Sequence, residues 1–295
     1  NTDFQNGIQV TELMMGDIGT GTIVTIDQVY PEPRSELRQM PVWFANSEQF
    51  LMIKGDSTNS EIVAVDIGDM TSQTLTTVQG IKCEAVLSPD EELIAFLVKS
   101  EFKMDIWLFD RVTEEEMQLT FSEREKAMLR FSPDGEKIAF VQNNTTTKND
   151  IMVVSVDGGA PRQVSTHTEW ELDPDWIDND YISYTMRPAT TRLLAHGSLD
   201  DEPTRNFISS PGAHLVMPHW SLDRNHLFYQ AGWPQGPLML RDIKTGKKEE
   251  LISVVQQPLL SRDQSRVAYI DPKDAPSQFL WRENVEHIVR TTKLP

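Results

Sequence analysis

Met128–Val141 reads MLRFSPDGEKIAFV: an apolar run that ends at Phe131, a Ser-Pro-Asp-Gly turn, and a second apolar run. Asp-Gly readily adopts the positive φ angles that tight hairpin turns require, so this stretch predicts two antiparallel strands. The same pattern returns five more times in variants that keep both apolar runs. The anchor residues of the six copies are Trp43, Leu87, Phe131, Trp176, Trp220 and Leu260.

The spacing of these anchors is 44, 44, 45, 44 and 40 residues. A fixed period of about 40–45 residues with four apolar runs per period is typical of a β-propeller. We therefore predict an all-β fold, a six-bladed β-propeller of four-stranded antiparallel blades. Residues 1–295 are expected to form one domain, because a repeat array that closes on itself has a single continuous core.

Residues 1–39, which precede the first repeat, are expected to supply closing strands and a connecting loop. Gly7–Met14 and Gly21–Asp27 resemble the third and fourth strands of a repeat. Pairing them into the last blade would cover sheet edges that otherwise expose unpaired backbone groups. Gln278–Asn284 and Glu286–Thr291 are alternative candidates for the same outer positions.

The net charge of the chain limits the classes of partner that it can bind. Its net charge is −18, so nucleic acid and anionic lipid surfaces are poor partners. No apolar run approaches the ~18 residues that a membrane-spanning helix needs. The lone cysteine, Cys83, cannot form an internal disulfide. We expect a monomer whose partner is a protein or peptide.

Motifs for catalysis are absent from the sequence. A serine hydrolase of the α/β type needs a Gly-x-Ser-x-Gly elbow, and the nearest stretch, Ala195–Leu199, lacks the second glycine. Zinc motifs of the His-Glu-x-x-His or paired Cys-x-x-Cys kind do not occur. We therefore expect no catalytic residues, no cofactor and no hydrolase activity.

Two weaker metal hypotheses remain open, one for manganese and one for calcium. His167, His214 and His219 could approach one another at one end of a channel and hold a divalent ion. The acidic run from Asp173 to Asp180 resembles a calcium loop. Alignment to the repeat, however, places Asp173 and Asp175 on a strand and Asp178–Asp180 in the hairpin turn, which favours turn chemistry.

Loops that join blade to blade emerge on the same face as loops that join second to third strands. Aromatic and charged side chains on exposed loops are common at recognition sites. The residues expected on this face are Phe102, His167, Trp170, Arg187, His214 and Trp233. Trp233 could instead fold over the blade as a cover.

A second candidate surface is the row of residues that directly precede the anchors on the first strands. These residues are Val42, Val86, Arg130, Asp175, His219 and Leu259. Because unpaired charge between packed blades is costly, we expect Arg130 and Asp175 to form an ion pair, with His219 next in line. The group could be a polar network that stabilises the ring or a ligand site in the channel.

The phrase FSPDGEKIAFV, followed by DIMVVSVDGG, resembles the propeller repeat of the TolB family, and LSPDEELIAFLV with DIWLFD is a second close match. The resemblance spans the chain and is strongest in the second and third repeats. It covers the propeller alone, since TolB carries an α/β domain ahead of it. It implies an exported bacterial protein, periplasmic or secreted, that acts by binding.

The leading functional hypothesis is a non-enzymatic propeller that binds a protein or peptide across its loop face or channel mouth. Similar repeats also build oligogalacturonate lyases, which makes a metal-dependent carbohydrate-active lyase or hydrolase an alternative. Related propellers precede the hydrolase domain of prolyl-oligopeptidase-type peptidases. A regulatory propeller of a separate peptidase domain is therefore a third hypothesis.

Overall fold

The computed structural model describes strands of the chain from Thr2 to Lys293, and side chains between Val42 and Val255. The described residues are 2–5, 8–16, 23–29, 42–46, 48–55, 58–69, 71–100, 103–145, 148–165, 169–187, 193–199, 206–207, 215–221, 223–232, 235–260, 266–270 and 289–293. They form two compact units: the first holds the described residues up to Leu129 together with Val156–Gly159, and the second holds the other described residues from Arg130 on.

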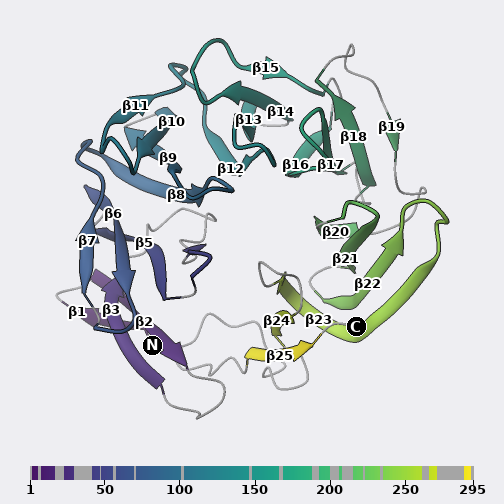
Figure 1. Ribbon diagram of the computed structural model, residues 1–295, viewed down its shortest axis with the longest axis horizontal. Helices are drawn as coiled ribbons and strands as arrows, with labels where there is room; N and C mark the ends of the chain where they lie inside the picture. The colour runs from purple at the N-terminus through teal and green to yellow at the C-terminus, as the bar shows by residue number, and fades with distance from the viewer. Residues whose placement is uncertain are drawn as a thin grey trace. The chain divides into compact units, whose positions relative to one another are not determined.

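Every described regular element is a β-strand (Figure 1). The first unit holds β1 (Thr2–Gln5), β2 (Ile8–Gly16), β3 (Ile23–Val29), β4 (Val42–Trp43), β5 (Gln49–Gly55), β6 (Ser60–Asp66), β7 (Ser72–Thr74), β8 (Ile81–Leu87), β9 (Leu93–Ser100), β10 (Lys103–Asp110) and β11 (Glu116–Gln118). The remaining strands are β12 (Lys126–Phe131), β13 (Lys137–Thr145), β14 (Lys148–Ser155), β15 (Arg162–Gln163), β16 (Trp170–Trp176), β17 (Tyr181–Arg187), β18 (Leu193–Ser198), β19 (Asn206–Phe207), β20 (Leu215–Trp220), β21 (His226–Ala231), β22 (Gly236–Asp242), β23 (Lys248–Leu260), β24 (Arg266–Ile270) and β25 (Val289–Lys293).

The repeats predicted from the sequence form antiparallel sheets in chain order. Four four-stranded sheets comprise β4–β7, β8–β11, β12–β15 and β16–β19. The fifth repeat supplies β20, β21 and β22, which continue into β23. In all six repeats the anchor is the last residue of the first strand, as in β4 with Trp43 and β16 with Trp176. The predicted all-β fold with four-stranded antiparallel sheets is thereby confirmed.

One long strand joins the fifth and sixth repeats. The first part of β23 pairs with β22, whereas Gln256, Leu259 and Leu260 pair with β24. Next to β24 lies β25, with Ile270 opposite Val289. The predicted outer strand Glu286–Thr291 is therefore corrected: Val289–Thr291 belong to a strand beside β24, and residues 286–288 lie outside the described residues. Val289, Thr291 and Thr292 suit that position because β-branched side chains favour pleated sheets.

The N-terminal strands pair among themselves in the order β1–β2–β3. The predicted strands at Gly7–Met14 and Gly21–Asp27 correspond to β2 and β3, and β1 is an additional strand that the sequence analysis missed. Closure of the last blade by this segment stays a prediction. The alternative candidate Gln278–Asn284 lies outside the described residues.

Bulges recur on the first strands just before the anchors. The register shifts between Lys82 and Ala85 in β8, between Leu172 and Asp175 in β16, and between Val216 and His219 in β20. A bulge inserts one residue and re-aims the side chains that follow it. Three first-strand residues adopt positive φ: Met128 (59°) in β12, and Asp173 (51°) and Met217 (52°) within the bulges of β16 and β20. Each of them lies three positions before its anchor.

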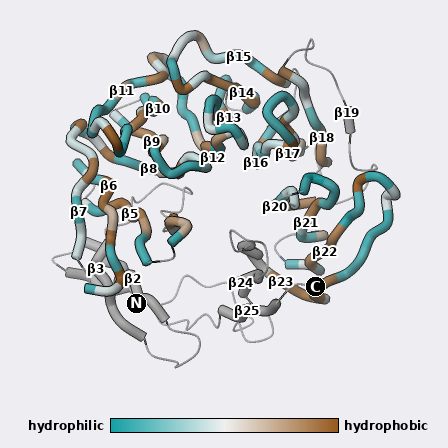
Figure 2. The backbone as a smooth tube through the Cα atoms, in the orientation of Figure 1, coloured by the Kyte–Doolittle hydropathy of each residue, from teal (hydrophilic) through white to brown (hydrophobic). Residues whose placement is uncertain are grey.

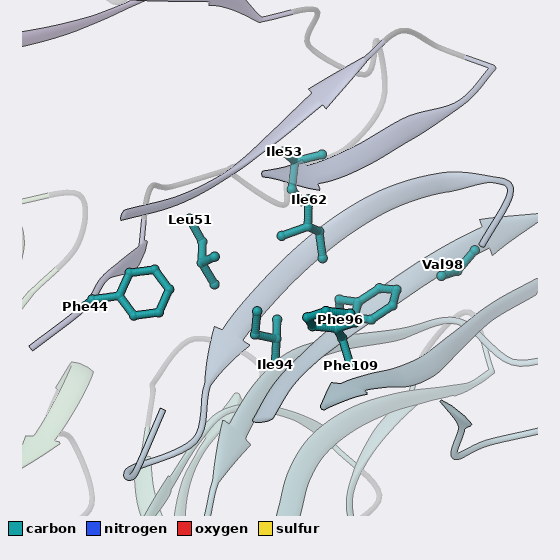
Figure 3. Close-up of a cluster of buried hydrophobic side chains, with 8 residues drawn as sticks. All are labelled: Phe44, Leu51, Ile53, Ile62, Ile94, Phe96, Val98 and Phe109. Atoms are coloured by element: carbon teal, nitrogen blue, oxygen red, sulfur yellow. The ribbon is translucent and has the colours of Figure 1, made fainter. Parts of the chain in front are cut away.

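The core of the first unit lies between neighbouring sheets. Leu51 and Ile62 of the first repeat pack with Ile94 and Phe96 of the second, and all four are almost completely buried (Figure 3). In the second unit, Leu194 belongs to a buried cluster with Trp220 and Tyr229. Strands buried on both faces explain why the middle strands read as continuous apolar runs.

Polar segments turn the chain between strands. The hairpin between β22 and β23, for example, is strongly hydrophilic (Figure 2). Across the part of the chain that the structure describes, no helix has the length and hydrophobicity to cross a membrane.

Candidate functional site

The candidate site lies on β12, β16 and β20 of the second unit, where Arg130, Asp175 and His219 each precede an anchor. The anchors hold these strands in place. The buried Trp176 donates its indole N–H to the backbone carbonyl of Arg130 at 3.0 Å. Trp220, also buried, donates its indole N–H to the hydroxyl oxygen of Ser183 at 2.8 Å.

The Asp175 carboxylate connects two first strands. Its Oδ1 accepts the backbone N–H of Trp176 at 3.0 Å, and its Oδ2 accepts the backbone N–H of Trp220 at 3.3 Å. Two N–H donors fix the orientation of the carboxylate. Asp175 therefore links the backbones of β16 and β20.

His219 lies within the electrostatic reach of three charged groups. Loss of solvation lowers the pKa of its imidazole, the carboxylates of Asp175 and Asp173 raise it, and the Arg130 guanidinium lowers it. The net effect is a lower pKa, so the neutral ring, with one N–H donor and one acceptor nitrogen, is favoured. The predicted site at Arg130, Asp175 and His219 stays a prediction, and so does the direct ion pair between Arg130 and Asp175.

Asp173 is a member of this cluster that sequence reasoning left out. It lies on the β16 bulge with positive φ, and its Oδ2 accepts the Thr185 hydroxyl at 2.9 Å. The sequence contains a signal for Asp173, because another acidic residue, Glu84, lies three positions before the anchor of the second repeat, as Asp173 does in the fourth. Glu84 accepts the backbone N–H groups of Met128 and Leu129, each at 2.8 Å. Acidic residues three positions before an anchor thus bond to a neighbouring first strand in the case of Glu84 and to the second strand of their own repeat in the case of Asp173.

Among the loop-face candidates, Trp170 is the one whose side chain the structure describes. Trp170 is the first residue of β16 and pairs in register with Arg187 at the end of β17. It is 39% exposed, but it lies on a strand rather than in the loop expected. Five residues separate it from Asp175, about 16 Å along an extended strand. Phe102, His167, His214 and Trp233 lie outside the described residues, as does the side chain of Arg187.

The acidic run in the fourth repeat is divided between strand and turn, as predicted. Asp173 and Asp175 belong to β16, whereas Asp178 Oδ1 accepts the backbone N–H groups of Asp180 and Tyr181, each at 2.8 Å. This is the hydrogen bonding of a polar turn residue. Among the residues with described side chains, no three His, Cys, Asp or Glu groups gather as a metal site.

The stretch Ala195–Leu199 has a structural explanation. Gly197 lies on β18, where a Cβ atom would come within 2.7 Å of Val164 Cγ1 and 3.0 Å of its carbonyl oxygen. The glycine permits close packing of β18 against the residue that follows β15. Ser198 is mostly buried at the end of the strand, unlike a nucleophile on a strained turn.

Solved structures share this arrangement of sheets. TolB from Acinetobacter baumannii superposes with a TM-score of 0.58 at 14% identity, over 91% of this chain and 72% of that one. The fold is that of a TolB-like β-propeller. Oligogalacturonate lyase from Vibrio parahaemolyticus gives a TM-score of 0.65 at 14% identity, over 88% and 77% of the two chains. The resemblance inferred from the repeats is confirmed.

The TolB-like propeller also matches parts of longer peptidases. A puromycin-hydrolyzing peptidase of Mycobacterium tuberculosis gives a TM-score of 0.66 at 18% identity, over 90% of this chain and 45% of that one. The uncharacterized peptidase YuxL of Bacillus subtilis is 24% identical over 157 residues, which is 52% of this chain and 22% of YuxL. The matched region is thus under a quarter of that relative's length. No protein-family profile matches the chain.

Proposed function

We propose that this TolB-like propeller is a non-enzymatic binding protein that recognises a peptide or protein segment through Arg130, Asp175 and His219, with Asp173 as a further contact. The observation that carries the proposal is that Arg130, Asp175 and His219 each precede an anchor on successive first strands, with the Asp175 carboxylate bonded to the backbone N–H of Trp220, next to His219. A positive group, two carboxylates and a neutral ring offer both donors and acceptors. Such a mixture suits a peptide, which carries both kinds of polar group, better than a purely anionic ligand.

The backbone around the site supports this proposal. The bulges of β16 and β20 redirect the residues that follow them, and the hydrogen bonds of Trp176 and Trp220 hold those strands. A site built on fixed strands loses little entropy when a ligand binds. The periplasmic or secreted location implied by the resemblance to TolB belongs to the same proposal.

Peptide selection tests this function. The intact protein would be screened against an immobilised random peptide library, and selected peptides would be titrated by calorimetry. We expect Asp175→Asn and His219→Gln each to weaken binding by about tenfold or more, which corresponds to about 1.4 kcal/mol. Lys244→Gln, an exposed turn residue of the same unit, is the matched control. Equal affinity in all four proteins would refute the proposed site.

A second candidate is a propeller that regulates a peptidase domain. It is favoured by the match to YuxL and by the match to part of the Mycobacterium tuberculosis peptidase. In that case the peptide bound at the site would be a substrate on its way to a catalytic domain. The gene beyond the codon for Pro295 tests it: a hydrolase domain encoded there supports this candidate, and peptides selected by the propeller should then be cleaved by the longer protein.

The lyase hypothesis predicts a different outcome in the same preparation. Oligogalacturonate turnover that requires manganese and is lost in His219→Gln would favour a lyase over a binding protein. Metal analysis of the purified protein, with His167→Gln and His214→Gln variants, would identify the ligands.

A further inference from the structure

The outer edge of the second repeat differs from the other outer edges whose side chains are described. Its outermost strand, β11, places Met117 in the centre with 45% of the residue exposed, and Val112 (73%) and Phe121 (80%) flank the strand. The equivalent strand of the first repeat, β7, consists of exposed Ser72, Gln73 and Thr74. The third repeat ends in Arg162 and Gln163. Three exposed apolar residues within ten positions thus mark one edge.

The backbone of β11 has hydrogen-bonding groups directed away from the sheet. Glu115 accepts the N–H of Asp110, and Leu119 donates its N–H to the Ile106 carbonyl, each on the inner side of the strand. Residues alternate along an antiparallel edge strand, so Glu116 and Gln118 turn their N–H and C=O groups outward. Because β11 is the terminal strand of its sheet, this side is available to an added strand.

The side chain of Glu116 holds the edge strand β11 in place. The Glu116 carboxylate accepts the backbone N–H and the hydroxyl of Thr77 at 2.8 and 2.7 Å, and the N–H of Val78 at 3.0 Å. These bonds fix β11 to the segment that leads into β8. A partner strand would therefore meet a backbone that is already ordered, which lowers the entropy cost of binding.

The charge of the edge indicates the chemistry of its partner. Residues 110–125 contain six acidic residues and two arginines. One of the arginines, Arg111, is engaged with the Phe44 ring and the Glu91 carbonyl. Glu115 and Met117 lie two residues apart, and therefore on one face of the strand. A partner strand that places a basic side chain beside Glu115 would place an apolar one beside Met117.

We propose that β11 is a docking edge for an extended segment of a partner protein, in which basic and apolar residues occur two positions apart. The segment adds as a fifth strand to the β8–β11 sheet, bonds to the outward backbone groups of Glu116 and Gln118, and covers Met117. This is strand addition to an exposed sheet edge. The proposal does not depend on the site around His219, which lies in the other unit.

A blocked nine-residue peptide tests the proposal. Its even positions are Lys, Val, Lys and Val, and its odd positions are Thr. The peptide can therefore pair with β11 in either direction. It would be titrated by fluorescence anisotropy into the intact protein, and into the variant Met117→Lys. The matched control is Gln73→Lys, which puts the same charge at the centre of the β7 edge. Equal melting temperatures of the three proteins show that both variants fold.

We expect Met117→Lys to weaken binding by about tenfold or more and Gln73→Lys by less than about twofold. Hydrogen exchange of the Glu116 and Gln118 amides should slow when the peptide binds wild-type protein. A peptide with Glu in place of Lys should not bind. If the two variants weaken peptide binding equally, the basic peptide is attracted only by the overall negative charge of the protein, and the proposal is overturned. Absence of binding, absence of protection at the two amides, or equal binding of the Glu peptide would overturn it as well.

Discussion

The indole N–H of Trp176 donates to the backbone carbonyl of Arg130, so the anchor of the fourth repeat is bonded to the first strand of the third. Trp220 reaches back in the same way but uses the Ser183 hydroxyl as its acceptor. Ser183 in turn donates to the Asp175 carbonyl at 3.2 Å. The anchors thus position the two residues, Arg130 and Asp175, on which the proposed site depends.

Replacing Trp176 with Phe should lower stability and ligand affinity together. The variant loses a buried hydrogen bond and part of a buried ring, and we expect a loss of about 2 kcal/mol in the free energy of unfolding. Urea unfolding followed by fluorescence of the remaining tryptophans measures it. An unchanged unfolding midpoint would contradict the role given to this bond.

Two buried lysines at the same repeat position should respond differently to substitution. Lys126 Nζ lies 2.9 Å from Asp105 Oδ1, and both side chains are buried. Lys82 Nζ donates instead to the carbonyls of Val78 and Gly80. Lys126→Met leaves the Asp105 carboxylate without its cation and should cost about 3–5 kcal/mol.

Lys82→Met is the matched control. It should lower the free energy of unfolding by about 1 kcal/mol, since it leaves no buried carboxylate without its cation. The double variant Lys126→Met with Asp105→Leu should recover much of the loss. Equal unfolding free energies for the two single variants would show that the ion pair is unimportant.

Acid should weaken the protein through the aspartates in the turns that follow the anchors of the second, third and fifth repeats. The Ser221 hydroxyl and the N–H of Asn225 hold the pKa of Asp223 well below its usual value near 3.8, and the Ser88 hydroxyl lowers that of Asp90. A depressed pKa in the folded state contributes stability above pH 3.8 that is lost as pH falls toward the folded value.

Asp223→Asn should therefore make stability less dependent on pH below 3.8, because the amide oxygen keeps the turn bonds without titrating. Asn46 of the first repeat already accepts the N–H of Glu48 in this manner. Urea midpoints between pH 5 and pH 2 measure the effect. The same slope in variant and wild type would contradict it.

Gly197→Ala should destabilise the protein by about 1–3 kcal/mol, the range for overpacking a tight contact. The added methyl meets Val164 side-chain and backbone atoms at 2.7 and 3.0 Å. Gly68→Ala is the control, because its methyl meets only the flexible Asp66 carboxylate. Thermal unfolding should separate the two variants, and similar melting temperatures would be inconsistent with close packing at Gly197.

Removal of Asn1–Asp27 tests the predicted closure of the propeller. If these residues cover an edge of the last blade, the truncated protein should melt at a lower temperature, because a sheet edge becomes exposed. Calorimetric scans of both proteins make the comparison. An unchanged melting curve would rule out closure by this segment.

The sequence predicted the local structure better than the contacts of individual side chains. Each anchor ends a first strand and Asp178 forms a turn, because strand alternation and turn chemistry depend on neighbouring residues. The bulge at Asp173 was not predicted, since it changes the register with a strand several residues away. Trp170 was assigned to an exposed loop, although it lies on β16. The exposure of its side chain depends on packing in the folded protein, which the neighbouring residues in the sequence do not reveal.

The site was predicted only in part for the same reason. Repeat alignment placed Arg130, Asp175 and His219 at equivalent positions, and in the structure each directly precedes the anchor that ends its first strand. Alignment alone did not reveal that the Asp175 oxygens accept backbone N–H groups from Trp176 and Trp220. Such bonds depend on the spacing of neighbouring repeats.

The bulge that recurs before several anchors gives the molecule a means of changing its specificity during evolution. Bulge and anchor determine the course of the first strand, so the residue between them is not needed to direct the backbone. Val86, Arg130, Asp175 and His219 occupy this one position in successive repeats, an apolar, a basic, an acidic and an imidazole side chain. Single substitutions there could give descendants of this protein new ligands while the backbone stays unchanged.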